Sequence, residues 1–131
     1  LLSEGNVKDG FIKACIEHNI PIVLAGSIRD DGPLPPVYHN VTSGLDAMKE
    51  QAQKATVIIC LATVLHSVAT ANLASSYKVV DGKVRPVYVY SIDIAEYAVN
   101  QVATAREHVG VKTIVTNVQD FVVNVQKNVL R

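Results

Sequence analysis

Short apolar runs alternate along the chain with longer segments whose apolar residues recur at helical spacing. Four of these runs predict strands, because they are short and rich in Val and Ile or, in residues 84–92, in Val and Tyr. They do not alternate strictly between apolar and polar side chains, which is typical of parallel strands that helices cover on both faces. The predicted strands are residues 20–25, 57–62, 84–92 and 112–115.

The segments between these runs predict helices. Ser3 and Ser43 are suited to cap the first two, and Asn19 followed by Pro21 ends the first. The expected helices are residues 3–18, 43–54 and 94–108, another that begins near residue 66 and a closing one that begins near residue 118. Alternating strands and helices require a parallel sheet, because each crossover returns the chain to the same end of the sheet. The expected fold class is therefore α/β, a doubly wound parallel sheet that forms one domain over residues 1–131.

Composition narrows the function classes. The chain has 131 residues, of which 49% are hydrophobic and 18% charged, as in a globular domain. Twelve basic and twelve acidic residues cancel, which argues against capture of nucleic acid or an anionic membrane by charge. No apolar run approaches the roughly 20 residues that cross a bilayer, and we expect a cytoplasmic protein. Cys15 and Cys60 are expected to be buried thiols, and no metal is expected because no two His residues have metal-ligand spacing.

Polar residues that could bind a ligand or take part in catalysis follow the predicted strands. The loop of residues 26–31 carries Arg29, Asp30 and Asp31 directly after the first apolar run. In an open α/β sheet, ligands bind beyond the carboxyl ends of the strands, where this loop is expected. The alternative is an ordinary turn in which Arg29 pairs with one of the two carboxylates.

Three further segments follow strands and are expected at the same edge: residues 63–66, Asp93 and residues 116–118. Asp93 could accept hydrogen bonds from both ribose hydroxyls of a nucleotide, which favours NAD over NADP, or it could cap the next helix. His66 could act as a general acid or base, or serve as a structural hydrogen-bonding residue. The usual Gly-x-Gly-x-x-Gly phosphate motif is absent, so glycine spacing predicts no standard dinucleotide site.

Three blocks resemble one known family: Glu-Gly-Asn-Val-Lys-Asp-Gly at residues 4–10, Val-Leu-Ala-Gly-Ser-Ile-Arg-Asp-Asp-Gly-Pro-Leu-Pro at residues 23–35, and Thr-Val-Leu-His-Ser-Val-Ala at residues 63–69. It is the lysine-oxoglutarate reductase/saccharopine dehydrogenase (LOR/SDH) bifunctional enzyme conserved-domain family. The family includes archaeal-type ornithine cyclodeaminases and the C-terminal domain of cyanobacterial arginine dihydrolase-ornithine cyclodeaminases. The resemblance implies a Rossmann-like, deoxyhypusine-synthase-like NAD-binding domain. The NAD contacts that it implies are Asp31, Thr63, Val64, Leu65, His66, Asp93, Asn117 and Val118.

The activity implied by the resemblance is NAD-dependent conversion of L-ornithine to L-proline and ammonia. By charge complementarity, Asp30 or Asp31 could hold a substrate ammonium, Arg29 a carboxylate, and His66 could move a proton. Two alternatives stay open, a non-catalytic NAD-binding or assembly subunit and a saccharopine or lysine-oxoglutarate type of amino-acid dehydrogenase.

Three departures from the family pattern bear on these expectations. Asn117 stands where the family usually has Asp, and residues 78–85 look inserted. The chain begins without Met and lacks sequence that family members carry upstream. We therefore expect a homo-oligomer, or a companion chain that carries the upstream part of the fold.

Overall fold

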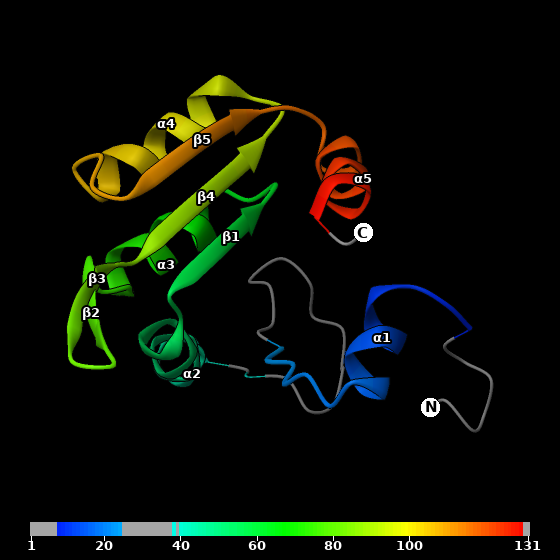
Figure 1. Cartoon of the computed structure of the whole chain (residues 1–131), viewed down its shortest axis with the longest axis horizontal. Helices are drawn as coiled ribbons and strands as arrows, with labels where there is room; N and C mark the ends of the chain where they lie inside the picture. Colours follow the sequence, from blue (N-terminus) through cyan, green and yellow to red (C-terminus); the bar gives the residue numbers. More distant parts are fainter. Residues whose placement is uncertain (1–7, 25–37, 39, 130–131) are drawn as a thin grey trace. The chain divides into compact units, whose positions relative to one another are not determined.

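The computed structural model describes residues 8–24, 38 and 40–129. The chain divides into two compact units, residues 1–45 and residues 46–131, called the first and second unit below (Figure 1). The described helices of both units include none long and apolar enough to cross a membrane.

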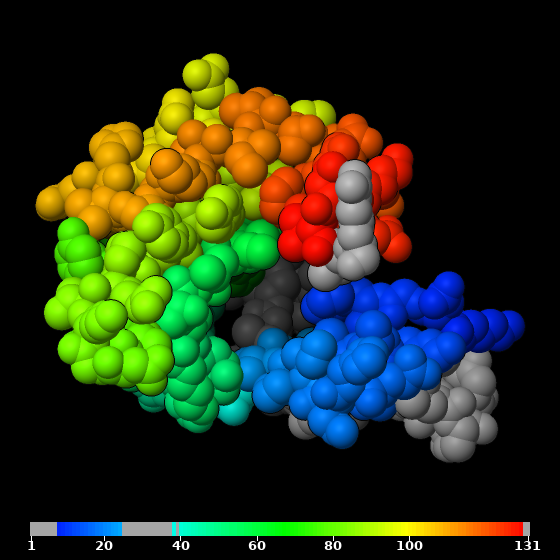
Figure 2. Space-filling model, in the orientation of Figure 1, coloured from blue at the N-terminus to red at the C-terminus, as the bar shows by residue number. Residues whose placement is uncertain are grey.

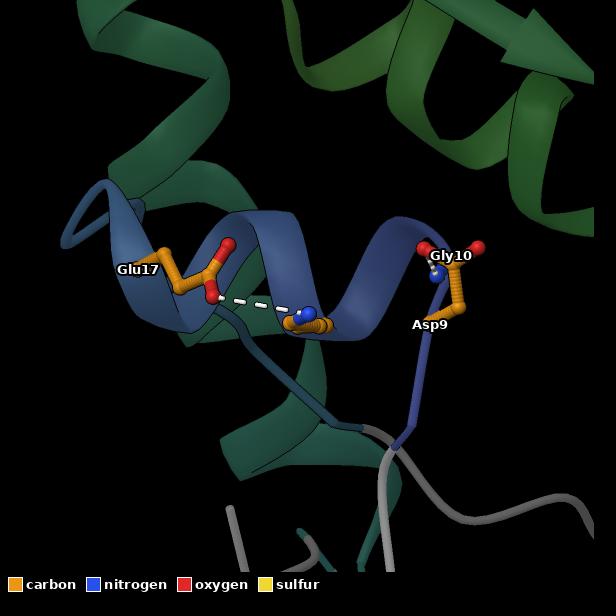
Figure 3. A network of polar contacts seen from close by, with 4 residues as sticks. Asp9, Gly10 and Glu17 are labelled. Atoms are coloured by element: carbon orange, nitrogen blue, oxygen red, sulfur yellow. Dashed lines mark hydrogen bonds and ion pairs between the residues drawn. The ribbon is translucent and has the colours of Figure 1, made fainter.

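Among the described residues of the first unit is the short helix α1 (Phe11–Glu17), which follows Gly10 at a φ of 101°. Figure 3 shows the Gly10 N–H donating to the Asp9 carboxylate (2.8 Å) ahead of the helix. The helix was expected to begin earlier; residues 8–10 are not helical, and Ser3 and Val7 lie outside the described residues.

The predicted end of this helix is confirmed. Asn19 adopts a φ of 53°, a left-handed conformation that Asn tolerates better than most side chains. The Asn19 N–H donates to the Ile16 carbonyl (3.2 Å) and the Ile20 N–H to the Cys15 carbonyl (2.8 Å). This pair of bonds is a Schellman motif, which satisfies carbonyls that a helix end otherwise leaves unpaired.

The prediction of a strand at residues 20–25 is wrong for its described part, since residues 20–24 belong to no strand. An apolar run becomes a strand only where a neighbour supplies a ladder of hydrogen bonds. The described part accepts one such bond, from the Tyr38 N–H to the Leu24 carbonyl (3.0 Å), and Pro21 has no N–H to donate.

Helix α2 (Val41–Lys54) begins two residues before the expected start. The Asn40 side chain caps it, because its Oδ1 accepts hydrogen bonds from both the backbone N–H and the hydroxyl of Ser43, each at 2.8 Å. The prediction that Ser43 caps this helix is therefore wrong. Ser43 is the third helical residue, and Asn40, which precedes the helix, supplies the capping oxygen.

The second unit is built on a parallel sheet, as predicted. Strands β1 (Val57–Leu61), β4 (Tyr88–Asp93) and β5 (Val111–Val115) pair in the order β1-β4-β5. The crossover helices α3 (Leu65–Leu73) and α4 (Glu96–Ala105) lie on the same side of this sheet (Figure 1). Helix α5 (Val118–Val129) follows β5. This β-α-β-α-β arrangement is the repeating half of a Rossmann fold.

The core lies between the sheet and its two crossover helices. Its buried members are Cys60, Ala71, Val89 and Val102, and half-buried apolar residues such as Ile58 and Val68 pack around them. All residues of β1 are apolar, but burial alternates along the strand. Cys60 is 8% exposed, whereas Val57 and Ile59 are each 52% exposed. Helices therefore cover β1 on one face only in the described part of the unit.

The predicted strand at residues 84–92 is two strands. Strand β3 (Lys83–Pro86) pairs antiparallel with β2 (Tyr77–Val80), and β4 begins after Val87. Asp81 and Gly82 form the turn with φ values of 51° and 73°, the two positive values of a type I′ hairpin turn. This hairpin occupies the segment that looks inserted, and its yellow-green atoms lie at the surface in Figure 2.

Candidate functional site

The carboxyl ends of β1, β4 and β5 bring three chain segments together. Leu61 lies opposite Ile92 in the sheet, and Asp93 lies opposite Val115. Backbone bonds continue the sheet one residue further, from the Ala62 N–H to the Ile92 carbonyl (2.9 Å) and from the Thr116 N–H to the Asp93 carbonyl (3.0 Å). The expected convergence of residues 63–66, Asp93 and residues 116–118 is thus present. Arg29, Asp30 and Asp31 lie outside the described residues.

The first segment turns sharply into helix α3. Ala62 adopts a φ of 52°, so the chain leaves β1 through a left-handed residue. Val64 occupies the N-cap position of α3 and supplies no side-chain hydrogen bond to it. Backbone N–H groups in the first turn of α3 are therefore left without a capping side chain, and they carry the positive end of the helix dipole.

Thr63 and His66 lie within hydrogen-bonding distance across this turn, with 3.2 Å between Thr63 Oγ1 and His66 Nδ1. When Nδ1 is unprotonated, the threonine hydroxyl can donate to it, and Nε2 then carries the ring proton. His66 is exposed and Thr63 half-buried. The pair presents a hydroxyl and an imidazole at the sheet edge.

Asp93 ends β4 and is half-buried. Its Oδ1 accepts a hydrogen bond from the Ala95 N–H (2.9 Å), which forms an Asx turn ahead of α4. Ala95, rather than Asp93, is the N-cap residue of that helix. The turn uses one carboxylate oxygen, and Oδ2 makes no hydrogen bond among the described residues.

Asn117 makes the equivalent contact before α5. Its Oδ1 accepts from the Gln119 N–H (2.8 Å), which forms an Asx turn ahead of α5. Asn117 is exposed and Val118, the first residue of α5, is half-buried. As an amide, Asn117 brings hydrogen-bonding capacity without charge to this edge.

Large apolar side chains are exposed beside these polar groups. Leu65, which begins α3, is 70% exposed; Ile94, next to Asp93, is 75% exposed; and Tyr97, in the first turn of α4, is 70% exposed. The sequence prediction included Leu65 but not Ile94 or Tyr97. Ile94 could have been found from its place directly after the strand-end carboxylate. Apolar surface of this kind suits planar rings, and polar groups beside it fix their orientation.

Cys60 lies behind the site, on the core face of β1. Burial raises the pKa of its thiol, and a hydrogen bond with the Ser67 side chain lowers it by a smaller amount. Cys15 is also buried, so both cysteines are buried thiols as predicted. In the described ranges, no group of three His, Cys, Asp or Glu side chains is arranged to hold a metal ion.

Comparison with known proteins places the chain in a family. Residues 2–125 match the family described as arginine dihydrolase ArgZ-like, C-terminal, Rossmann fold. Over 76 residues, 58% of this chain and 19% of the relative, the chain is 47% identical to an ornithine cyclodeaminase of Archaeoglobus fulgidus. Over 72 residues, 55% of this chain and 10% of the relative, it is 40% identical to the bifunctional arginine dihydrolase/ornithine cyclodeaminase ArgZ of Synechocystis.

Solved structures agree. An LOR/SDH protein from Methanococcus maripaludis superposes with a TM-score of 0.82 at 35% identity, over 96% of this chain and 34% of that one. AgrE, solved as a ternary complex with ornithine and NAD+, superposes with a TM-score of 0.78 at 28% identity, over 96% of this chain and 17% of that one. The chain thus spans about a third or less of the length of these relatives. The resemblance and the Rossmann fold expected from the sequence are confirmed, and the chain belongs to the ArgZ-like C-terminal Rossmann-fold family.

Proposed function

We propose that the carboxyl edge of the β1-β4-β5 sheet binds NAD, and that the chain is the NAD-binding part of an enzyme that converts L-ornithine to L-proline and ammonia. The observation that carries the proposal is the meeting of Thr63, His66 and Asp93 at one sheet edge, beside the uncapped start of α3. Family membership supports it, since relatives are named ornithine cyclodeaminases and the AgrE complex holds ornithine and NAD+.

The groups at this edge fit the parts of a dinucleotide. Asp93 Oδ2 is an acceptor suited to ribose hydroxyls, and its negative charge disfavours the extra phosphate of NADP. The uncapped N–H groups of α3 are donors suited to a pyrophosphate. The exposed Leu65 and Ile94 side chains offer apolar surface for a ring. Asn117 adds neutral hydrogen-bonding capacity, and Asp31, Val64 and Val118 complete the proposed contact set.

Bound NAD would supply the hydride acceptor and donor of the reaction. The chain's own part is to bind, orient and move protons. His66 is the proposed proton-transfer residue, because its ring is exposed and Thr63 can hold one ring nitrogen in a defined role. Asp30 or Asp31 is proposed to hold the substrate ammonium and Arg29 its carboxylate.

NAD titration of Asp93 variants tests the binding proposal. Asp93→Asn keeps an oxygen acceptor for the Ala95 N–H but loses the charge, whereas Asp93→Ala loses both. Both should weaken NAD binding by about 1–3 kcal/mol, and Asp93→Asn should also narrow the preference for NAD over NADP. Only Asp93→Ala should lower thermal stability appreciably, because only it removes the turn contact.

Asp46→Ala is the matched control, since Asp46 is an exposed aspartate on α2. Calorimetric titration should give it the NAD affinity of the parent chain. Unchanged NAD affinity in both Asp93 variants would remove Asp93 from the site.

A non-catalytic NAD-binding subunit is the second candidate. The described part of this edge, residues 62–66, 93–97 and 116–118, carries one imidazole, His66. This scarcity of side chains suited to proton transfer near neutral pH favours a binding role. NAD binding without ammonia release from ornithine would support this role, and ornithine-dependent ammonia release would exclude it.

The proposed function includes association with further polypeptide, either copies of this chain or a companion chain. Exposed apolar side chains on β1, namely Val57, Ile59 and Leu61, support association because water contact with a contiguous apolar patch is unfavourable. If the site is shared, NAD affinity should rise with protein concentration or on adding the companion. Light scattering that shows a monomer at all concentrations, with full-strength NAD binding, would contradict this part of the proposal.

A further inference from the structure

Arg106 is a buried arginine at the end of the sheet opposite the candidate site. It is the C-cap residue of α4 and is 6% exposed. Within the described residues, all its side-chain hydrogen bonds go to backbone carbonyls. Nη1 donates to Ala71 (3.2 Å) and Ala74 (3.0 Å), Nη2 to Ser75 (3.3 Å) and Val87 (3.3 Å), and Nε to Val109 (3.2 Å).

Peptide dipoles, rather than a carboxylate, solvate this buried cation. Ala71 and Ala74 carry carbonyls at the C-terminal end of α3, where the helix dipole is negative. Burial lowers the pKa of Arg106. Because the ordinary pKa of a guanidinium is far above neutrality, the group stays charged at neutral pH. The planar fork lets one side chain reach five carbonyls, a geometry that a lysine ammonium cannot reproduce.

These contacts join the far ends of the two elements that carry the site. The Ala71 and Ala74 carbonyls lie at the end of α3, whose first turn carries His66 and whose N-cap follows Thr63. The Val87 carbonyl lies directly before β4, whose last residue is Asp93. Arg106 therefore holds the end of α3 against the start of β4.

We propose that Arg106 is a positioning residue that sets the angle of α3 against β4, and through it the placement of Thr63 and His66 relative to Asp93. Helix α3 has nine residues and is roughly 13 Å long. A tilt of about 5° around its clamped end would move its beginning by about 1 Å over that length. A displacement of this size is large for a site that depends on hydrogen-bond geometry.

Arg106→Lys tests the proposal, with Arg106→Met as the stronger perturbation. Arg85→Lys is the matched control, because Arg85 is an exposed arginine of the β2-β3 hairpin in the same unit. Amide spectra of uniformly labelled protein should show Arg106→Lys folded, with shifts in residues 62–66 and 93–95 as well as near the substitution. NAD affinity should fall about tenfold in Arg106→Lys and further in Arg106→Met, and stay unchanged in Arg85→Lys.

A merely structural role predicts a different pattern. Shift changes confined to residues 71–76, 87 and 103–110, with a lowered melting temperature but parental NAD affinity, would overturn the proposal. An unfolded Arg106→Lys would also overturn it, because Arg106 would then be required for folding as a whole. The NAD measurement rests on the proposed function, whereas the amide shifts do not. Failure of the parent chain to bind NAD would therefore count against the proposed function alone.

Discussion

Replacing Gly110 with Ala should destabilise the second unit more than the same replacement at Gly82. Both glycines have a positive φ, +64° at Gly110 and +73° at Gly82, so both substitutions place an alanine in the left-handed region. They differ in their surroundings. A Cβ on Gly110 would lie 2.7 Å from the Val87 carbonyl oxygen, whereas a Cβ on Gly82 meets nothing within 4 Å.

The expected magnitudes follow from these two terms. The left-handed conformation costs an alanine about 1–2 kcal/mol, which is the whole penalty expected at Gly82. At Gly110 the overlap adds about 1–3 kcal/mol, because the contact is with backbone and cannot be relieved by rotating a side chain. The Val87 carbonyl also accepts a hydrogen bond from Arg106 (3.3 Å), and the Gly110 carbonyl accepts one from the Val89 N–H (2.9 Å). A shift of the backbone at either Val87 or Gly110 to relieve the overlap therefore disturbs one of these hydrogen bonds.

Urea denaturation of the parent chain and both variants measures the difference. We expect Gly110→Ala to lose about 2–5 kcal/mol of unfolding free energy and Gly82→Ala at most about 2 kcal/mol. With total stabilities of about 5–15 kcal/mol, the larger loss is readily resolved. Equal losses for the two variants would refute the account of close backbone approach at Gly110.

Two further predictions concern a helix end and a buried thiol. Glu107, at the C′ position of α4, has a φ of 50°, and its N–H donates to the Thr104 carbonyl (3.0 Å) in a Schellman motif. Because glycine adopts a positive φ without strain, Glu107→Gly should raise the free energy of unfolding by about 0.5–1 kcal/mol. A lower denaturation midpoint in this variant would contradict the prediction. Burial raises the pKa of the Cys60 thiol, so the folded chain keeps the thiol proton to a higher pH than the unfolded chain does. The stability that this difference contributes is fully present below the unfolded pKa of about 8.5 and is lost as the pH rises through the folded pKa. Melting temperatures recorded from pH 7 to 10 should fall less steeply in Cys60→Ser; identical slopes would show that the thiol does not contribute.

Local sequence was sufficient to predict the parallel sheet and the edge at which the polar residues after its strands lie. Residues 57–62 and 112–115 are apolar runs after helical segments, and strand-end polar residues such as Asp93 must meet at the same edge of a parallel sheet. Asp81-Gly82 between Val-rich runs was a recognisable hairpin signal, which would have paired residues 83–86 with residues 77–80 and so ended β3 before β4. The Val and Tyr residues of 84–92 favoured one long strand instead.

Other features depend on contacts distant in sequence. Arg106 lies in the segment Ala-Arg-Glu-His, which has the composition of an exposed helix end, and only the packing of α3 and β4 surrounds it with carbonyls. The apolar run at residues 20–24 is rich in residues that favour strands. It forms no strand because strand formation also requires a neighbouring strand to pair with. Ala62 gave no indication of its positive φ, because that conformation is set by how the chain leaves β1 for α3.

The central claim, that NAD binds at the carboxyl edge of this sheet, is tested most directly by mapping amide shifts during NAD titration of the labelled chain. The method detects even millimolar binding, so it applies if the isolated chain binds weakly. The account predicts that the largest shifts lie in residues 62–66, 93–95 and 116–118, and that Asp93→Asn reduces them at equal NAD concentration. Shifts centred elsewhere, or none at millimolar NAD, would contradict it.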